Sequence, residues 1–168
     1  KMLWTNQQHM LRSTPEHLAR YLKPQLEALG LVADDLSKVA AVAKAQQERA
    51  KTLREMAANS QFFFRDLSGY DEKAAAKNLT AETAPVLEAV GSKLAQLPDW
   101  KAPAIHVAIM TVAEALGLGL GKVAQPIRVA VSGGTVSPPI DVTLEILGRE
   151  TTRQRLADAI DFARRPRS

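Results

Sequence analysis

A stretch between Leu120 and Gly148 carries polar residues whose types and spacing fit a binding site. Lys122, Gln125 and Arg128 follow one another at intervals of three, so on a helix they lie along one side. Lysine attracts anions as a point charge, whereas the planar guanidinium of Arg128 can also form paired hydrogen bonds or stack on a flat group. These residues predict a surface that binds something anionic or flat.

The same stretch contains signals for a bend between two helices. Gly133 and Gly134 allow positive φ without steric cost, and Gly148 can end the second helix. Ser137 has the side chain of a helix N-cap, and Pro138 suits the first helical position. We therefore predict an elbow, residues 128–140, with Arg128 on one side and the free N–H donors of a capped helix start on the other.

Composition and periodicity predict helices for the rest of the chain. Apolar residues make up 46% of the sequence, only 5% of residues are aromatic, and Ala, Leu and Val are prominent, which favours helices over sheets. Apolar spacing and capping residues predict helices over about 15–29, 36–58, 81–97, 102–116 and 149–163, with a short one after Asp71. Pro24 is expected to kink or end the first of these near Lys23. The prediction is an all-α fold whose internal boundary lies in the 66–80 connection.

No constellation of catalytic or metal-binding residues appears in the sequence. His9, His17 and His106 have no partner at a trusted metal-ligand spacing, and there is no cysteine. The common nucleophile, phosphate-loop and zinc-hydrolase motifs are absent. The acidic pairs Asp34-Asp35 and Asp71-Glu72 are explained by helix capping. The residues alone therefore predict no catalytic site and no metal.

Charge and hydropathy limit the classes of partner that the chain could bind. The net charge is +4, with 22 basic residues interspersed among 18 acidic ones, so most charges suit a solvated surface and a polyanion-binding face remains an option. There is no apolar run of about 18 residues and no signal-peptide core, so we expect a cytoplasmic protein without a membrane span. The chain begins at Lys1 on an amphipathic stretch and looks like part of something longer.

Several short segments form an ordered signature over almost the whole sequence. They are K-M-L-W-T-N at 1–6, R-A-K-T-L-R-E-M at 49–56, G-K-V-A-Q-P-I-R-V-A-V-S-G at 121–133, S-P at 137–138 and I-L-G-R-E at 146–150. In order and spacing they resemble the C-terminal, anticodon-binding region of bacterial glutamyl-tRNA synthetases, which are class I enzymes. Each match is weak alone, and the joint arrangement makes the resemblance specific.

The resemblance implies a fold, a partner and site residues. It implies two packed small helical subdomains, 1–66 and 67–168, forming the helical cage with which these synthetases bind the anticodon of tRNA(Glu). By the family's pattern, Arg49 helps select the third anticodon base and separates tRNA(Glu) from tRNA(Gln). The anticodon-binding positions are carried over to Arg128, Ser137, Pro138 and Ile140, with possible backbone contacts by Lys122 and Gln125. Ile140 replaces the family's more usual leucine.

The departures from the family concern catalysis. The segments resembling His-Ile-Gly-His and Lys-Met-Ser-Lys, which carry ATP binding and amino-acid activation in the family, are absent. We expect a non-catalytic fragment of a ligase that attaches glutamate to tRNA(Glu) with ATP. No cofactor is expected in the fragment, because ATP and Mg²⁺ belong to the upstream catalytic domain, which is its expected partner. We expect a monomer.

Two other functions stay open at this point. A helical protein–protein interaction module without RNA binding would use Phe62–Phe64 or the stripe Met2–Leu11 as its surface. A free-standing enzyme is disfavoured because no nucleophile–base or metal constellation exists. The sequence also does not decide whether tRNA(Gln) is accepted.

Overall fold

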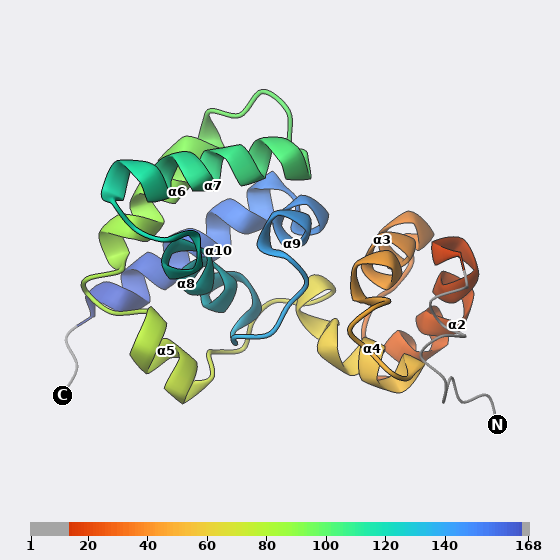
Figure 1. The fold of residues 1–168 in the computed structure, drawn as a ribbon. Helices are drawn as coiled ribbons and strands as arrows, with labels where there is room; N and C mark the ends of the chain where they lie inside the picture. The colour runs from red at the N-terminus through yellow and green to blue at the C-terminus, as the bar shows by residue number, and fades with distance from the viewer. Residues whose placement is uncertain (1–13, 166–168) are drawn as a thin grey trace. The chain divides into compact units, whose positions relative to one another are not determined.

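The chain is all-α, as predicted, throughout the part that the structure describes. In the computed structural model this part is residues 14–165, which form nine α-helices and one 3₁₀ helix, with no strand among them (Figure 1). The chain divides into two compact units, one ending at Asp66 and the other beginning at Leu67. These limits are the same as those of the two predicted subdomains. That each unit is a separate domain stays a prediction.

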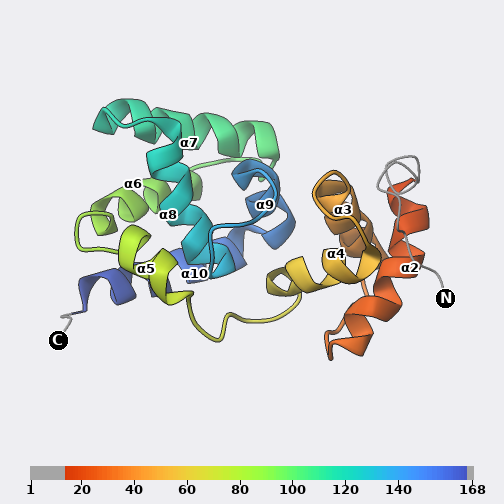
Figure 2. The same ribbon diagram turned by 60° about the horizontal axis from the view of Figure 1, so that its bottom comes forward.

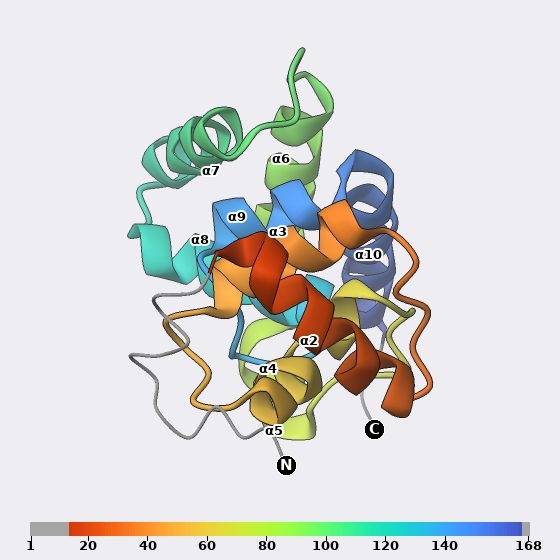
Figure 3. The same ribbon diagram turned by 90° about the vertical axis from the view of Figure 1, so that its right-hand side faces the viewer.

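The first unit consists of α2 (Pro15–Ala28), α3 (Leu36–Gln46), α4 (Leu53–Asn59) and η1 (Gln61–Phe63). Helix α2 packs against both α3 and α4 (Figure 3). Leu18, Leu22 and Leu26 of α2 are fully buried, as are Val39 and Val42 of α3 and Met56 of α4. Burial of these side chains removes apolar surface from water and gives the small unit its core.

Helix α2 begins as predicted and continues past its internal proline. The Thr14 hydroxyl accepts a hydrogen bond from the His17 N–H at 3.1 Å, with Pro15 in the first turn. Pro24 does not end the helix, because α2 continues to Ala28 and the leucines on either side of Pro24 are buried. Gly30, with φ 81°, ends it.

The predicted long helix over 36–58 is wrong, because the chain breaks between α3 and α4. The Thr52 hydroxyl accepts from the Glu55 N–H at 3.0 Å, and the Glu55 carboxylate accepts from the Lys51 N–H at 3.2 Å. This reciprocal capping starts a new helix, as in a capping box. Residues 47–52 therefore form a turn, and Arg49 lies in it.

The second unit consists of α5 (Glu72–Asn78), α6 (Ala84–Ala95), α7 (Ala102–Leu116), α8 (Leu120–Ser132), α9 (Ile140–Leu147) and α10 (Arg149–Arg164). Helix α8 contacts every other helix of this unit, and Figure 2 shows it running between α7 and α10. Val123, Ile127, Val129, Ala130 and Val131 on α8 are fully buried. The helix predicted to carry the site is therefore the central helix of its unit.

Several helix ends in the second unit follow local signals, whereas the start of α6 does not. Asp71 caps α5 through the Ala74 N–H at 3.0 Å, and Gly117 ends α7 with φ 67°, both as predicted. The helix predicted over 81–97 instead begins at Ala84. The Thr83 hydroxyl accepts from the Thr80 N–H at 2.9 Å and donates to the Asn78 carbonyl at 2.7 Å, so it stabilises the turn before the helix.

Three leucines at helix ends, Leu29, Leu36 and Leu116, are exposed although they follow the apolar spacing from which these helices are predicted. Phe62 and Phe63 are buried, so most of the aromatic cluster belongs to the core of the first unit. The Met2–Leu11 stripe lies outside the described residues. Within residues 14–165, no helix has the length and apolar character needed to cross a membrane.

Candidate nucleic-acid interface

Helix α8 presents a polar side opposite its buried apolar side. Lys122 is exposed, Gln125 and Arg128 are half-buried, and Ser132 completes the stripe at the end of the helix. The Gln125–Arg128 side-chain contact confirms that these two residues share a side. The apolar side fixes the rotation of α8 in the core, and this determines where the polar side chains emerge.

Arg128 connects three of the residues singled out from the sequence. Its Nε donates to the Ser137 hydroxyl oxygen at 2.9 Å, and one Nη donates to the Gln125 side-chain oxygen at 2.6 Å. A guanidinium has only donors, so the amide oxygen of Gln125 must face it. The amide nitrogen of Gln125, with two N–H donors, is therefore turned away from Arg128.

Ser137 is not an N-cap, which corrects the prediction. Helix α9 begins only at Ile140, after Pro139, and no side chain caps it. The second proline explains the shift, because a residue that precedes proline is disfavoured in the helical region. Ser137 instead lies 4% exposed, and its hydroxyl donates to the Pro138 carbonyl at 2.7 Å.

Pro138 and Ile140 are also buried in the described structure. Thr143, fully buried on the first turn of α9, donates to the Pro138 carbonyl at 3.0 Å. The exposed residues of this loop include Thr135, Pro139 and Val136, and 71% of the Val136 surface is accessible. Sequence reasoning missed Val136, because an isolated valine between polar residues carries no distinctive signal.

The elbow is supported by contacts from distant parts of the second unit. Gly133 has φ 83°, and a Cβ on it would lie 3.0 Å from the Gly69 carbonyl oxygen. The Gly133 carbonyl also accepts from the Asp71 N–H at 2.8 Å. From α10, the guanidinium of Arg155, a residue only 8% exposed, donates to the Val131 carbonyl at 2.6 Å. Glycine at 133 is therefore favoured by its positive φ, and a side chain there would in addition lie tightly against the Gly69 carbonyl oxygen.

Arg49 lies in the first unit, in the turn between α3 and α4. Its side chain is exposed, and its backbone N–H donates to the Gln46 carbonyl at 2.9 Å. Lys51 and Arg54, which follow it, are exposed as well. The turn and the first turn of α4 therefore present three basic side chains, of which the sequence resemblance singled out Arg49.

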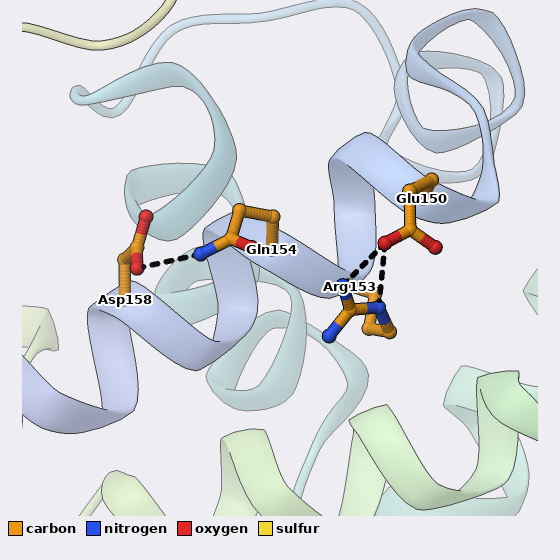
Figure 4. Close-up of polar contacts among 4 residues, drawn as sticks. All are labelled: Glu150, Arg153, Gln154 and Asp158. Carbon is orange, nitrogen blue, oxygen red and sulfur yellow. Dashed lines mark hydrogen bonds and ion pairs between the residues drawn. The ribbon is translucent and has the colours of Figure 1, made fainter.

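The outer side of α10 differs from α8, because its exposed Arg153 is paired with a carboxylate of the same helix and an amide bonds a second carboxylate. Figure 4 shows the Arg153 guanidinium on the Glu150 carboxylate and the Gln154 amide on Asp158, the latter at 2.9 Å. The hydrogen bond and positive charge of Arg153 lower the pKa of the Glu150 carboxyl. With Arg153 paired to an acid and the exposed Asp158 carboxylate beside it, this side of α10 is a poor candidate for binding a polyanion.

Metal-binding chemistry has no candidate among residues 14–165. No group of three His, Cys, Asp or Glu side chains there could hold an ion. His17 lies edge-on against the Tyr21 ring, with centroids 5.1 Å apart, and His106 is half-buried on α7. His9 lies outside the described residues.

Comparisons with known proteins give a consistent answer. The family described as "Anticodon binding domain" matches residues 17–160. Glutamate–tRNA ligase 1 of Alkalilimnicola ehrlichii is 54% identical over 96% of this chain and 34% of its own length, and glutamate–tRNA ligase 2 of Halorhodospira halophila is 50% identical over 98% and 35%. The crystal structure of a glutamate tRNA ligase from Elizabethkingia meningosepticum is similar over 96% of this chain and 32% of that chain, with a TM-score of 0.86 and 30% identity. The chain thus spans about a third of the length of the relatives that it matches.

Proposed function

Because the chain belongs to the anticodon-binding domain family, we propose that it is the region of a glutamate–tRNA ligase that reads the tRNA anticodon. The observation that carries this proposal is the family match over residues 17–160. The relatives named as glutamate–tRNA ligases extend the proposal to the whole protein, which would attach glutamate to tRNA(Glu) with ATP. ATP and Mg²⁺ would then bind in a catalytic domain outside this chain.

We propose that α8 and the elbow form one reading surface. Unpaired anticodon bases can be splayed out and read on their hydrogen-bonding edges. The half-buried Arg128 supplies a planar donor group, and the amide nitrogen of Gln125, which is turned away from Arg128, supplies two more donors for base or phosphate oxygens. Lys122, one turn earlier and exposed, suits a phosphate.

The elbow loop would contribute through its shape. The side chains of Ser137, Pro138 and Ile140 are buried, so we propose that they hold the loop backbone in a form that fits the anticodon. Val136 would provide an apolar surface against a base.

In the first unit we propose Arg49 as the residue that distinguishes the third anticodon base. Its exposed side chain, beside the exposed Lys51 and Arg54, is accessible to a polyanion. Specificity for tRNA(Glu), a monomeric state and a cytoplasmic location are further parts of the proposal.

The alternative, an interaction module without RNA binding, has less support. The family match favours tRNA binding, and the aromatic residues Phe62 and Phe63 that such a module would expose are buried.

The proposal is tested by binding this chain to unmodified transcripts of tRNA(Glu) and tRNA(Gln) over a salt series. We expect tighter binding of tRNA(Glu), with affinity falling as salt rises because phosphate contacts release counterions. Equal weak binding of both transcripts at low salt would show charge attraction only, and would contradict anticodon reading by this chain.

A further inference from the structure

We infer that Ser137 contributes to tRNA binding only through Arg128, as a positioning residue that aims the guanidinium and makes no contact with RNA. The inference rests on the proposed function, in which Arg128 reads the anticodon. It departs from the resemblance, which implies an RNA contact at Ser137 itself.

The only hydrogen-bond donor of the Ser137 side chain is already used. A serine hydroxyl has a single proton, and here it is donated to the Pro138 carbonyl at 2.7 Å. The oxygen accepts from Arg128 Nε at 2.9 Å. With the residue 4% exposed, the hydroxyl has neither a spare proton nor an open path to a base.

A second buried hydroxyl keeps Ser137 in this orientation. Thr143 Oγ1 donates to the same Pro138 carbonyl at 3.0 Å and lies 3.5 Å from the Ser137 hydroxyl oxygen. The Pro138 carbonyl therefore accepts from two side chains that belong to the loop and to α9. Rotation of the Ser137 hydroxyl away from this carbonyl would give up a buried hydrogen bond, which is costly.

The guanidinium of Arg128 is consequently held at two edges, at Nε by Ser137 and at one Nη by Gln125. An arginine that is fixed before RNA arrives loses less rotamer freedom on binding. Removing the Ser137 hydroxyl frees the Nε edge of the Arg128 guanidinium. The contribution of Arg128 to tRNA affinity should then fall, although its positive charge remains.

A double-mutant cycle tests this inference. Dissociation constants for the tRNA(Glu) transcript are measured for the parent chain, Ser137→Ala, Arg128→Ala and the double variant, with thermal unfolding of each recorded by circular dichroism. We expect Arg128→Ala to weaken binding roughly 10- to 100-fold, as for loss of a base-edge contact. Ser137→Ala should weaken it roughly 2- to 10-fold, as for loss of one hydrogen bond. The double variant should bind like Arg128→Ala alone.

Two further variants separate positioning from a general loss of structure. Ser137→Thr keeps the hydroxyl and should restore binding to within about twofold of the parent. If Ser137→Ala unfolds the chain, Ser137→Cys fills the same space with a weak acceptor, and the cycle is run with that variant.

Each contrary outcome has a distinct meaning. The positioning role would be overturned if Ser137→Ala weakened tRNA binding by the same factor in the parent chain and in the Arg128→Ala variant. It would also be overturned if Ser137→Ala bound tRNA like the parent while Arg128→Ala bound it weakly. Parent-like binding of Arg128→Ala would instead contradict the proposed reading role of Arg128, and the inference would fall with it.

Discussion

The two arginines proposed to read the anticodon are presented in opposite ways. Arg128 lies on a central helix, and its guanidinium donates to Ser137 and Gln125. Arg49 lies in an exposed turn, where the hydrogen bond present is that of its backbone N–H to Gln46. A guanidinium fixed in advance binds with little loss of rotamer freedom, whereas an arginine side chain ordered only on binding loses about 2 kcal/mol of it. An RNA contact made by Arg128 should therefore contribute more to affinity than an equivalent contact made by Arg49.

The largest effect is expected from breaking the elbow at Gly133. In Gly133→Val, a β-branched residue would have to adopt a positive φ, and its Cβ would lie 3.0 Å from the Gly69 carbonyl oxygen. We therefore expect a loss of about 3 kcal/mol in the free energy of unfolding. Urea unfolding followed by circular dichroism measures it.

Gly134→Val is the matched control, because no atom lies within 4 Å of a Cβ placed on Gly134 and its φ is not positive. It should change the unfolding free energy by less than about 1 kcal/mol. Equal losses in the two variants would show that position 133 has no special conformational requirement.

The next prediction compares two arginines of α10, the buried Arg155 that supports the elbow and the exposed Arg153. Arg155→Leu removes the hydrogen bond to the Val131 carbonyl and leaves that acceptor without its buried donor. We expect a loss of about 2 kcal/mol in unfolding free energy, because unmade buried hydrogen bonds are costly. Arg153→Leu, on the exposed side of α10, should lower the unfolding free energy clearly less than Arg155→Leu does, because exposed ion pairs contribute little to stability. A larger loss in Arg153→Leu than in Arg155→Leu would reverse this ranking.

Substitution of Arg49 tests whether this residue affects the choice between tRNA(Glu) and tRNA(Gln) and not only the overall affinity for tRNA. Arg49→Ala should reduce the preference for tRNA(Glu) over tRNA(Gln) by roughly 1 to 2 kcal/mol, the range of one base contact, with unfolding unchanged. Filter binding of both transcripts measures it. Arg54→Ala, which removes an exposed charge nearby, should weaken both tRNAs equally. A loss of preference in Arg54→Ala and none in Arg49→Ala would mean that Arg54, and not Arg49, discriminates between the two tRNAs.

Helix ends could be predicted from the sequence where one local signal stood alone. Gly30, Asp71 and Gly117 each end or start a helix as expected, because a positive φ or a capping carboxylate acts over a few residues. The T-x-x-E signal at Thr52 was equally local, but the apolar periodicity over 36–58 gave the opposite prediction. In the structure the reciprocal cap prevails over that periodicity.

The sequence predicted which residues of the candidate site lie near one another, but it did not predict the hydrogen bonds between them. The spacing of Gln125 and Arg128 placed them together, and the glycine turn brought Ser137 near them. Two adjacent prolines then delayed α9, so Ser137 became an acceptor for Arg128 where a helix cap was predicted. The contact between Arg155 and Val131 depends on how α10 packs against α8, and a run of charged residues in the sequence carries no such information.

The smallest effect is expected on the outer side of α10. Arg153 lowers the pKa of Glu150, so the favourable contribution of this carboxylate to folding is present above its unfolded pKa and is lost as pH falls through the lower folded value. Near pH 7 Glu150→Gln should therefore differ from the parent only by a small, salt-sensitive change in unfolding temperature, because both partners are exposed. An NMR titration should show the Glu150 pKa rising toward its ordinary value in Arg153→Leu. A fall in unfolding temperature as large as that of Arg155→Leu would mean that exposed pairs stabilise this unit as much as the buried support of the elbow does.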